Sequence, residues 1–116
     1  LILASSCNYW SLAASGNSSS LAASGNSSRL AASGNFSRLA ASGNSSNIEL
    51  KGLDNVGANI GIKGQIKGKI GNWITLAEYD KNLKPICVKS AKIDGKKIKE
   101  DVFYKLEGGK FCEVKN

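Results

Sequence analysis

The sequence predicts an all-β chain: a short parallel β-solenoid, or β-roll, of nine-residue repeats with two repeats per coil, capped by a small antiparallel β domain. Two observations lead to this prediction. Residues 11–46 are four near-identical copies of the phrase Ser/Arg-Leu-Ala-Ala-Ser-Gly-Asn-Ser-Ser, with Phe36 as the exception at the eighth position. After Asn47 the composition changes, because all nine acidic residues and all fourteen lysines lie from residue 48 onward.

Each copy of the repeat combines a short extended stretch with a turn. Leu-Ala-Ala forms the strand, and alternation along it sends Leu21 and Ala23 inward and Ala22 outward. Gly25 and Asn26 are expected to take the positive φ that a tight corner requires. A helix is excluded because Gly-Asn recurs in every copy and leaves no helical run long enough to persist in water.

Nine residues are too few for a complete coil with two strands, so two repeats are expected to form each coil. Leu12 then stacks on Leu30, and Leu21 on Leu39. The repeat register extends back to the segment 2–10, so nonapeptides cover residues 2–46. The spacing resembles that of calcium-binding nonapeptide rolls, but the Asp that binds the metal there is absent, so calcium is not expected.

Residues 47–71 are expected to continue the solenoid as degenerate, longer coils, which sets the first domain at 1–71. Asn47-Ile-Glu-Leu-Lys-Gly and Asn59-Ile-Gly-Ile-Lys-Gly match each other at a separation of twelve residues. Lysines are expected outside, and the apolar residues expected inside are Ile48, Leu50, Ile60, Ile62, Ile66 and Ile70.

Residues 72–116 are expected to form the antiparallel capping domain. Residues 73–79 and 85–93 alternate like strands, Asp94-Gly95 indicates a hairpin turn, and Gly108-Gly109 indicates a final hairpin. This domain is expected to plug the open end of the roll. Its predicted core residues are Trp73, Leu76, Ile86, Val88, Ile93, Val102, Tyr104, Leu106, Phe111 and Val114.

These blocks carry a resemblance to a known group of sequences. The Gly-Asn nonapeptides, Trp73-Ile-Thr-Leu-Ala-Glu78, and Asp94-Gly95 followed by Tyr104-Lys-Leu106 resemble a family of uncharacterised β-solenoid proteins of phages, prophages and gut bacteria. The resemblance implies a setting in the cytoplasm of a bacterial host or in the virion. It implies no activity and no active-site motif.

Chemistry-bearing residues are scarce. The chain has no His, so an imidazole base or a Ser-His or Cys-His pair is excluded, and no enzyme activity, metal or cofactor is expected. Cys7, Cys87 and Cys112 lack metal-ligand spacing and are expected to be reduced, with facing of Cys87 and Cys112 across strands as an alternative. No apolar run long enough to span a membrane is present.

The candidate interaction surface combines aromatic and basic residues. Phe36 either contacts a partner or packs under the C-terminal cap, and Tyr9 and Trp10 either form a contact or cap the first coil. The net charge is +7, and the basic candidates are Arg29, Arg38, Lys51, Lys63, Lys67 and Lys69. The four lysines are expected to form a ladder on one face of the coils.

The function expected from these features is that of a non-enzymatic structural or protein-interaction solenoid, encoded by a phage or mobile element, that self-associates or docks on a partner protein. Two alternatives are an inhibitor of a host defence system and a nucleic-acid binder that uses the lysine ladder. Ice binding is a further alternative, although the outward rows are Ala and Ser rather than ordered Thr.

Overall fold

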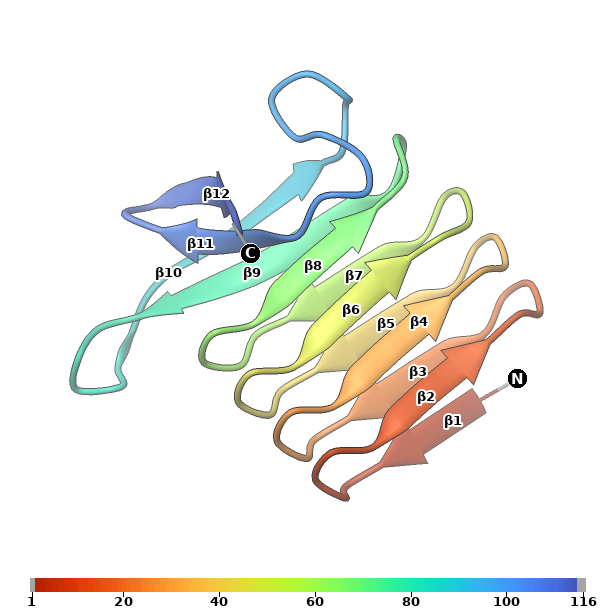
Figure 1. The fold of residues 1–116 in the computed structure, drawn as a ribbon, viewed down its shortest axis with the longest axis horizontal. Coiled ribbons are helices and arrows are strands. Elements are labelled where there is room, and N and C mark those ends of the chain that lie inside the picture. Colours follow the sequence, from red (N-terminus) through yellow and green to blue (C-terminus); the bar gives the residue numbers. More distant parts are fainter. Residues whose placement is uncertain (1, 115–116) are drawn as a thin grey trace.

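The computed structural model describes residues 2–114, and every regular element in this range is a β-strand. The strands form two six-stranded sheets (Figure 1). Sheet A has the order β1-β3-β5-β7-β9-β10, and sheet B the order β12-β11-β8-β6-β4-β2. The predicted all-β fold, a parallel β-solenoid with antiparallel strands near the C-terminus, is therefore confirmed.

The parallel strands are β1 (Ile2–Ser5), β2 (Ser11–Ala14), β3 (Ser20–Ala23), β4 (Arg29–Ala32), β5 (Arg38–Ala41), β6 (Asn47–Leu50), β7 (Val56–Asn59), β8 (Gln65–Gly68) and β9 (Trp73–Tyr79). The remaining strands, which pair antiparallel, are β10 (Pro85–Lys92), β11 (Tyr104–Glu107) and β12 (Lys110–Glu113). The ends of the two predicted domain ranges, at residues 1 and 115–116, lie outside the described residues.

Consecutive repeats alternate between the two sheets, so two repeats make one coil as predicted. Leu12 pairs with Leu30 in sheet B, and Leu21 pairs with both Leu3 and Leu39 in sheet A. Leu21 and Ala23 are buried and Ala22 is exposed, which confirms the predicted alternation. The interior is a thin apolar layer between the sheets, formed mainly by one Leu or Ile and one Ala or Leu from each coil strand.

Two ladders of side chains satisfy the backbone at the corners. Asn17 Oδ1 accepts a hydrogen bond from the N–H of Asn35 at 2.9 Å, one coil further along the chain. Ser37 Oγ accepts from the N–H of Ser19 at 3.3 Å, in the opposite direction. The seventh and ninth residues of the repeat therefore accept hydrogen bonds from backbone N–H groups at the corners, so few polar groups there lack a partner.

The corner glycine has a different role from the one predicted. Positive φ occurs at the eighth position, at Ser27 (55°) and Phe36 (60°) for example, and not at Gly25 or Asn26. A Cβ on Gly25 would lie 2.0 Å from the carbonyl oxygen of Cys7 in the adjacent coil. Glycine is needed because the coils approach each other too closely for a side chain.

The prediction of longer coils after residue 46 was wrong. Strands β6, β7 and β8 begin at Asn47, Val56 and Gln65, so the nine-residue spacing persists. Ile48, Leu50 and Ile66 are buried as predicted, but Ile60 and Ile70 are 46% and 48% exposed because both fall at corners.

Strand β9 belongs to both parts of the fold. It pairs parallel with β7 and antiparallel with β10, so it ends the coil stack in sheet A. In sheet B the stack ends where Tyr104 of β11 pairs with Ile66 of β8. Gly108 and Gly109, with φ of 63° and 74°, form the predicted turn between β11 and β12.

The Asp94-Gly95 hairpin does not form. Asp94 Oδ1 accepts hydrogen bonds from the N–H groups of Lys96 (2.8 Å) and Ile98 (3.1 Å), which closes an Asx-type turn at the start of a longer loop. This loop inserts Ile98 into the core and then leads into β11. Asp94 and Gly95 therefore begin the long connection from β10 of sheet A to β11 of sheet B.

The core of the C-terminal part was predicted in part. Leu76, Ile93, Tyr104 and Leu106 are buried, and Val102 and Phe111 pack against them. Ile74 and Ile98 are buried although they were not predicted. The exceptions are Trp73, Ile86 and Val88, which are 48%, 58% and 59% exposed, and Val114, which is partly buried but not part of this core.

Candidate interaction surfaces

The two candidate arginines lie on opposite faces of the molecule. Arg29 is an outward residue of β4 in sheet B, and Arg38 is the equivalent residue of β5 in sheet A. They occupy the same position of consecutive repeats, and consecutive repeats alternate between sheets. The structure therefore does not bring them together into one basic surface.

Three of the four candidate lysines gather, and the fourth does not. Lys51 and Lys69 follow β6 and β8, one coil apart at the same corner, and Lys67 lies beside them on β8. Lys63 lies in the turn between β7 and β8, at the opposite corner, with φ of 58°. The predicted four-residue lysine ladder on one face is therefore wrong.

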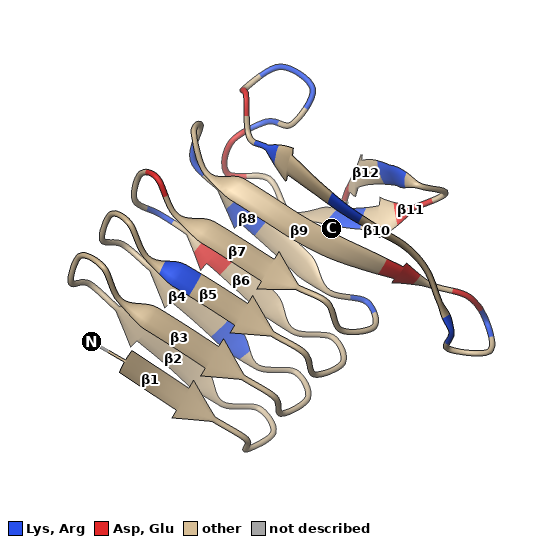
Figure 2. Cartoon of the chain, turned by 180° about the vertical axis from the view of Figure 1, so that it is seen from behind, with Lys and Arg blue, Asp and Glu red and all other residues tan. Residues whose placement is uncertain are grey.

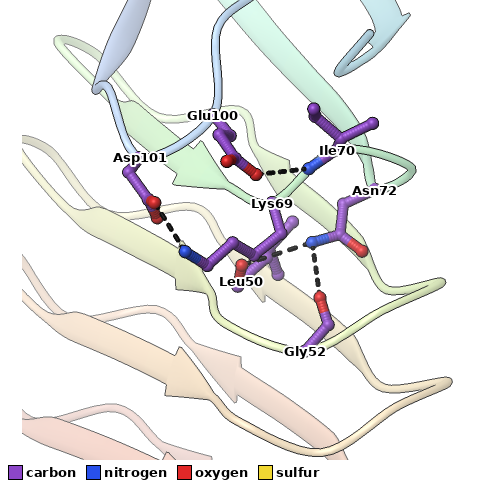
Figure 3. A network of polar contacts seen from close by, with 7 residues as sticks. All are labelled: Leu50, Gly52, Lys69, Ile70, Asn72, Glu100 and Asp101. Carbon is purple, nitrogen blue, oxygen red and sulfur yellow. Dashed lines mark hydrogen bonds and ion pairs between the residues drawn. The ribbon is translucent and has the colours of Figure 1, made fainter. Parts of the chain in front are cut away.

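The three gathered lysines are paired with carboxylates. Glu49 lies 3.8 Å from both Lys51 and Lys67, and the Asp101 carboxylate lies 2.6 Å from Lys69 Nζ (Figure 3). The hydrogen bond and the negative charge of Asp101 raise the pKa of Lys69. These acids reduce the positive potential that a phosphate backbone would require.

The same corner is fixed by a buried amide. Asn72 Nδ2 donates to the carbonyl oxygens of Leu50 (3.2 Å) and Gly52 (3.0 Å), which lie in the previous coil (Figure 3). The N–H of Ile70 donates to Glu100 at 3.4 Å, next to the Lys69–Asp101 pair. The lysine cluster is thus part of the junction between the last coil and the loop before β11.

The aromatic candidates are all exposed. Phe36 is 60% exposed, so the alternative that it packs under the C-terminal cap is wrong. Its N–H donates to the carbonyl oxygen of Leu53 in the next coil, and Leu53 is itself 54% exposed. Tyr9 and Trp10 are 81% and 51% exposed, so they do not close the first coil.

One group of exposed apolar residues was not predicted as a site. Val56, Ile60, Trp73 and Val88 come from β7, the turn after it, β9 and β10, and they are 46%, 46%, 48% and 59% exposed. We call these four residues the A patch. They lie at the β10 end of the outer face of sheet A. Their neighbours Gly57, Ile74 and Cys87 are buried or partly buried, whereas Lys89 is exposed.

The A patch consists of two apolar rows separated by a row of smaller residues. Val56 pairs with Trp73 in one row, and Val88 pairs with Ala77 in the other, with Ile60 in the turn after β7. Between these rows lie Ala58, Thr75 and Ser90, which continue a row of small residues that runs along the sheet through Ala40. The alternation of residues 73–79 could have revealed this patch. Ile74 and Leu76 face inward, so Trp73 must face outward.

The outer face of sheet A carries little charge. Arg38 and Lys92 are the charged residues at the outward strand positions of its described part, which is mostly uncharged in Figure 2. Sheet B presents Arg29, Glu49 and Lys67 at its outward positions. The Lys67 ammonium also lies 4.8 Å from the centre of the Phe103 ring.

Other kinds of site are not apparent in the described part of the chain. Between residues 2 and 114 no group of three or more His, Cys, Asp or Glu side chains is arranged to hold a metal ion. Cys87 and Cys112 do not form a disulfide, and Cys7 is also a free thiol. No described helix could cross a membrane.

The stacked nine-residue repeats and their two corner ladders define a parallel β-solenoid protein, closed at its C-terminal end by antiparallel strands. Comparison of the chain with known protein families, with curated proteins and with solved structures finds no match.

Proposed function

We propose that this protein is a non-enzymatic interaction module of a phage or other mobile element, and that it self-associates through the β10 end of sheet A. The observation that carries the proposal is the A patch, with Ile86 next to it at 58% exposure. Apolar side chains exposed together on one face of a sheet are typical of a protein contact, because burying them releases water from apolar atoms.

The distribution of charge supports association between chains over nucleic-acid binding. The A patch is flanked by Arg38 and Lys92 but by no outward strand carboxylate, and three of the candidate lysines already have acidic partners. Each chain carries a net charge of +7, so two chains repel each other at low ionic strength. Self-association should therefore strengthen as salt is added, whereas binding to nucleic acid should weaken.

The test is light scattering coupled to size exclusion over a range of protein concentrations, at low and high salt. The wild-type chain is compared with Val88→Lys, which places a charge in the A patch. The matched control is Leu53→Lys, which adds the same charge at a residue of similar exposure, 54% against 59%, in the corner between β6 and β7 and not on β10.

The expected result is a concentration-dependent oligomer of the wild type and of Leu53→Lys, and a monomer for Val88→Lys. Circular dichroism of the monomeric variant should show the same strand content as the wild type, because residue 88 points to solvent. A wild-type monomer at every concentration and salt level would overturn the proposal. Loss of association in both variants would show that the added charge, and not the A patch, controls association.

A further inference from the structure

The strand at the end of sheet A has an unpaired edge. β10 is eight residues long, it pairs with β9 on one side, and no other strand of residues 2–114 pairs with its outer side. Edge strands of this length present a row of backbone N–H and C=O groups that can pair with another strand.

The pairing with β9 identifies which residues of β10 direct their backbone N–H and C=O groups to the open edge. The N–H of Ile93 donates to Asn72 O at 2.8 Å, and Ile93 O accepts from the N–H of Gly71 at 2.8 Å, so Ile93 directs both groups toward the coil stack. Hydrogen bonding alternates along an antiparallel strand, so Ala91 and Lys89 also face β9, whereas Ser90 and Val88 direct their N–H and C=O groups to the open edge.

A side-chain contact agrees with this assignment. Ser90 lies opposite Thr75, and their hydroxyl oxygens are 2.7 Å apart. Side chains come closest in the pairs of an antiparallel ladder that do not exchange backbone hydrogen bonds. Ser90 is therefore not bonded through its backbone to β9, and its backbone groups are available at the edge.

The features that usually protect an edge strand are weak along the middle of β10. Lysines often serve this purpose, but Lys89 Nζ donates to the carbonyl oxygen of Gly109 at 2.6 Å and is held against the β11–β12 turn. Pro85 and Lys92 stand at the two ends of the strand. The centre of β10 carries Val88, the most exposed member of the A patch.

We propose that the self-association proposed above is formed by antiparallel pairing of β10 with β10 of a second copy of this chain, centred on Val88. Two-fold symmetry then places Val88 opposite Val88 of the second copy, Lys89 opposite Cys87, and Ser90 opposite Ile86. Within residues 85–92 this register sets no lysine opposite a lysine. Lys92 lies opposite Lys84, which directly precedes the strand, and added salt weakens the repulsion of this pair. It covers the two most exposed apolar residues of the strand and joins the two A sheets into one continuous sheet.

The exposure of the outward residues fits a missing neighbour strand. Val56 and Trp73 stand on strands with a neighbour on each side and are 46% and 48% exposed, whereas Val88 on the edge is 59% exposed. An added strand would bring Val88 close to the exposure of its interior counterparts.

The first test is residue-resolved amide exchange by nuclear magnetic resonance at low and high protein concentration. The amides of Val88 and Ser90 should exchange about tenfold or more slowly in the associated state. The amides of Lys89 and Ala91 are already bonded to β9, so their exchange should not slow in this way. Equal protection of all four amides, or of none, would overturn edge pairing.

The second test uses Ser90→Pro with Ser90→Ala as its control. Proline removes the outward N–H and blocks the edge, and the position does not donate to β9. Alanine removes only the hydroxyl that contacts Thr75. Dimerisation should weaken about tenfold or more in Ser90→Pro, since a symmetric pair loses the bond twice, and should be unchanged in Ser90→Ala.

A third variant separates this inference from the proposed function. Val56→Lys alters the A patch on β7, two strands from the edge, so it should leave edge pairing intact. If Val56→Lys abolishes association and Ser90→Pro does not, the chains pack face to face; the proposed function then stands and the edge inference is wrong. A wild type that never associates overturns both.

Discussion

Asn59 occupies the space that Gly64 leaves. In the repeats of residues 11–46 the fourth residue is Ala and the ninth is Ser, whereas this repeat has Asn and Gly at those positions. Asn59 Nδ2 donates to the carbonyl oxygens of Ser46 (2.6 Å) and Gln65 (3.2 Å), and a Cβ on Gly64 would lie 2.3 Å from Asn59 Oδ1. The amide thus fills the space of the missing corner serine from the other side of the interior. Its bonds differ, because it donates to carbonyl oxygens, whereas Ser37 and Ser46 Oγ accept from backbone N–H groups.

This pair predicts a rescue. Asn59→Ala should destabilise the chain by about 2 kcal/mol because one buried and one partly buried hydrogen bond are lost. Gly64→Ser should cost about 2 kcal/mol because it collides with the amide. The double variant restores the Ala and Ser of the other repeats and should recover most of the loss in a double-mutant cycle by urea unfolding. Additive losses would contradict the compensation.

The corner glycines predict different effects for the same substitution. Gly34→Ala would place a Cβ 2.2 Å from the carbonyl oxygen of Gly16, so unfolding free energy should fall by about 3 kcal/mol. Gly16→Ala meets nothing nearer than Ser19 Oγ at 3.7 Å and should cost less than about 1 kcal/mol. Urea unfolding of both variants decides, and similar losses would refute close coil contact as the reason for glycine.

Phe36 predicts a stabilising substitution. Its φ of 60° is unfavourable for a bulky residue, and its side chain is 60% exposed. Phe36→Asn should raise the free energy of unfolding by about 0.5 kcal/mol, because Asn adopts this conformation more readily. A loss of stability in thermal unfolding would show instead that the ring makes contacts worth more than the backbone cost.

Asp94 predicts an acid-sensitive turn. The backbone N–H groups of Lys96 and then Ile98 lower the pKa of this carboxyl below its ordinary value, so its contribution is present above the unfolded pKa of about 3.9. That contribution is lost as the pH falls through the folded pKa. Asp94→Asn should therefore be less stable than the wild type at neutral pH, and the gap should close below about pH 4. A constant gap in urea unfolding across this range would contradict the assignment.

Much of the coil stack follows from the sequence because its local and global requirements agree. The Leu12–Leu30 and Leu21–Leu39 pairs were predictable, since a nine-residue phrase holds one strand and one corner, and two such phrases are the smallest number that closes a coil. The role of Gly25 was not predictable, because it depends on the distance to Cys7 in another coil and not on its own φ.

The errors have two physical sources. The apparent twelve-residue repeat arises because the segments that begin at Asn47 and Asn59 are similar in sequence. Asn47 is the first residue of β6, whereas Asn59 is the last residue of β7 and is buried. Trp73 and Val88 were predicted inside because they are bulky and apolar, but the phase of a strand is fixed by the residues that reach the core, here Ile74 and Leu76. The A patch could therefore not be found from hydrophobicity alone.

The alternation of repeats between sheets restricts how such an array can change in length. Loss or gain of a single nonapeptide would move every repeat on its N-terminal side to the other sheet, so that Arg29 and Arg38 would exchange faces for any change placed after them. Loss or gain of two nonapeptides would restore each residue to its original face. An array that grows or shrinks by copying errors in its gene would thus keep the composition of its two surfaces only when the errors come in even numbers.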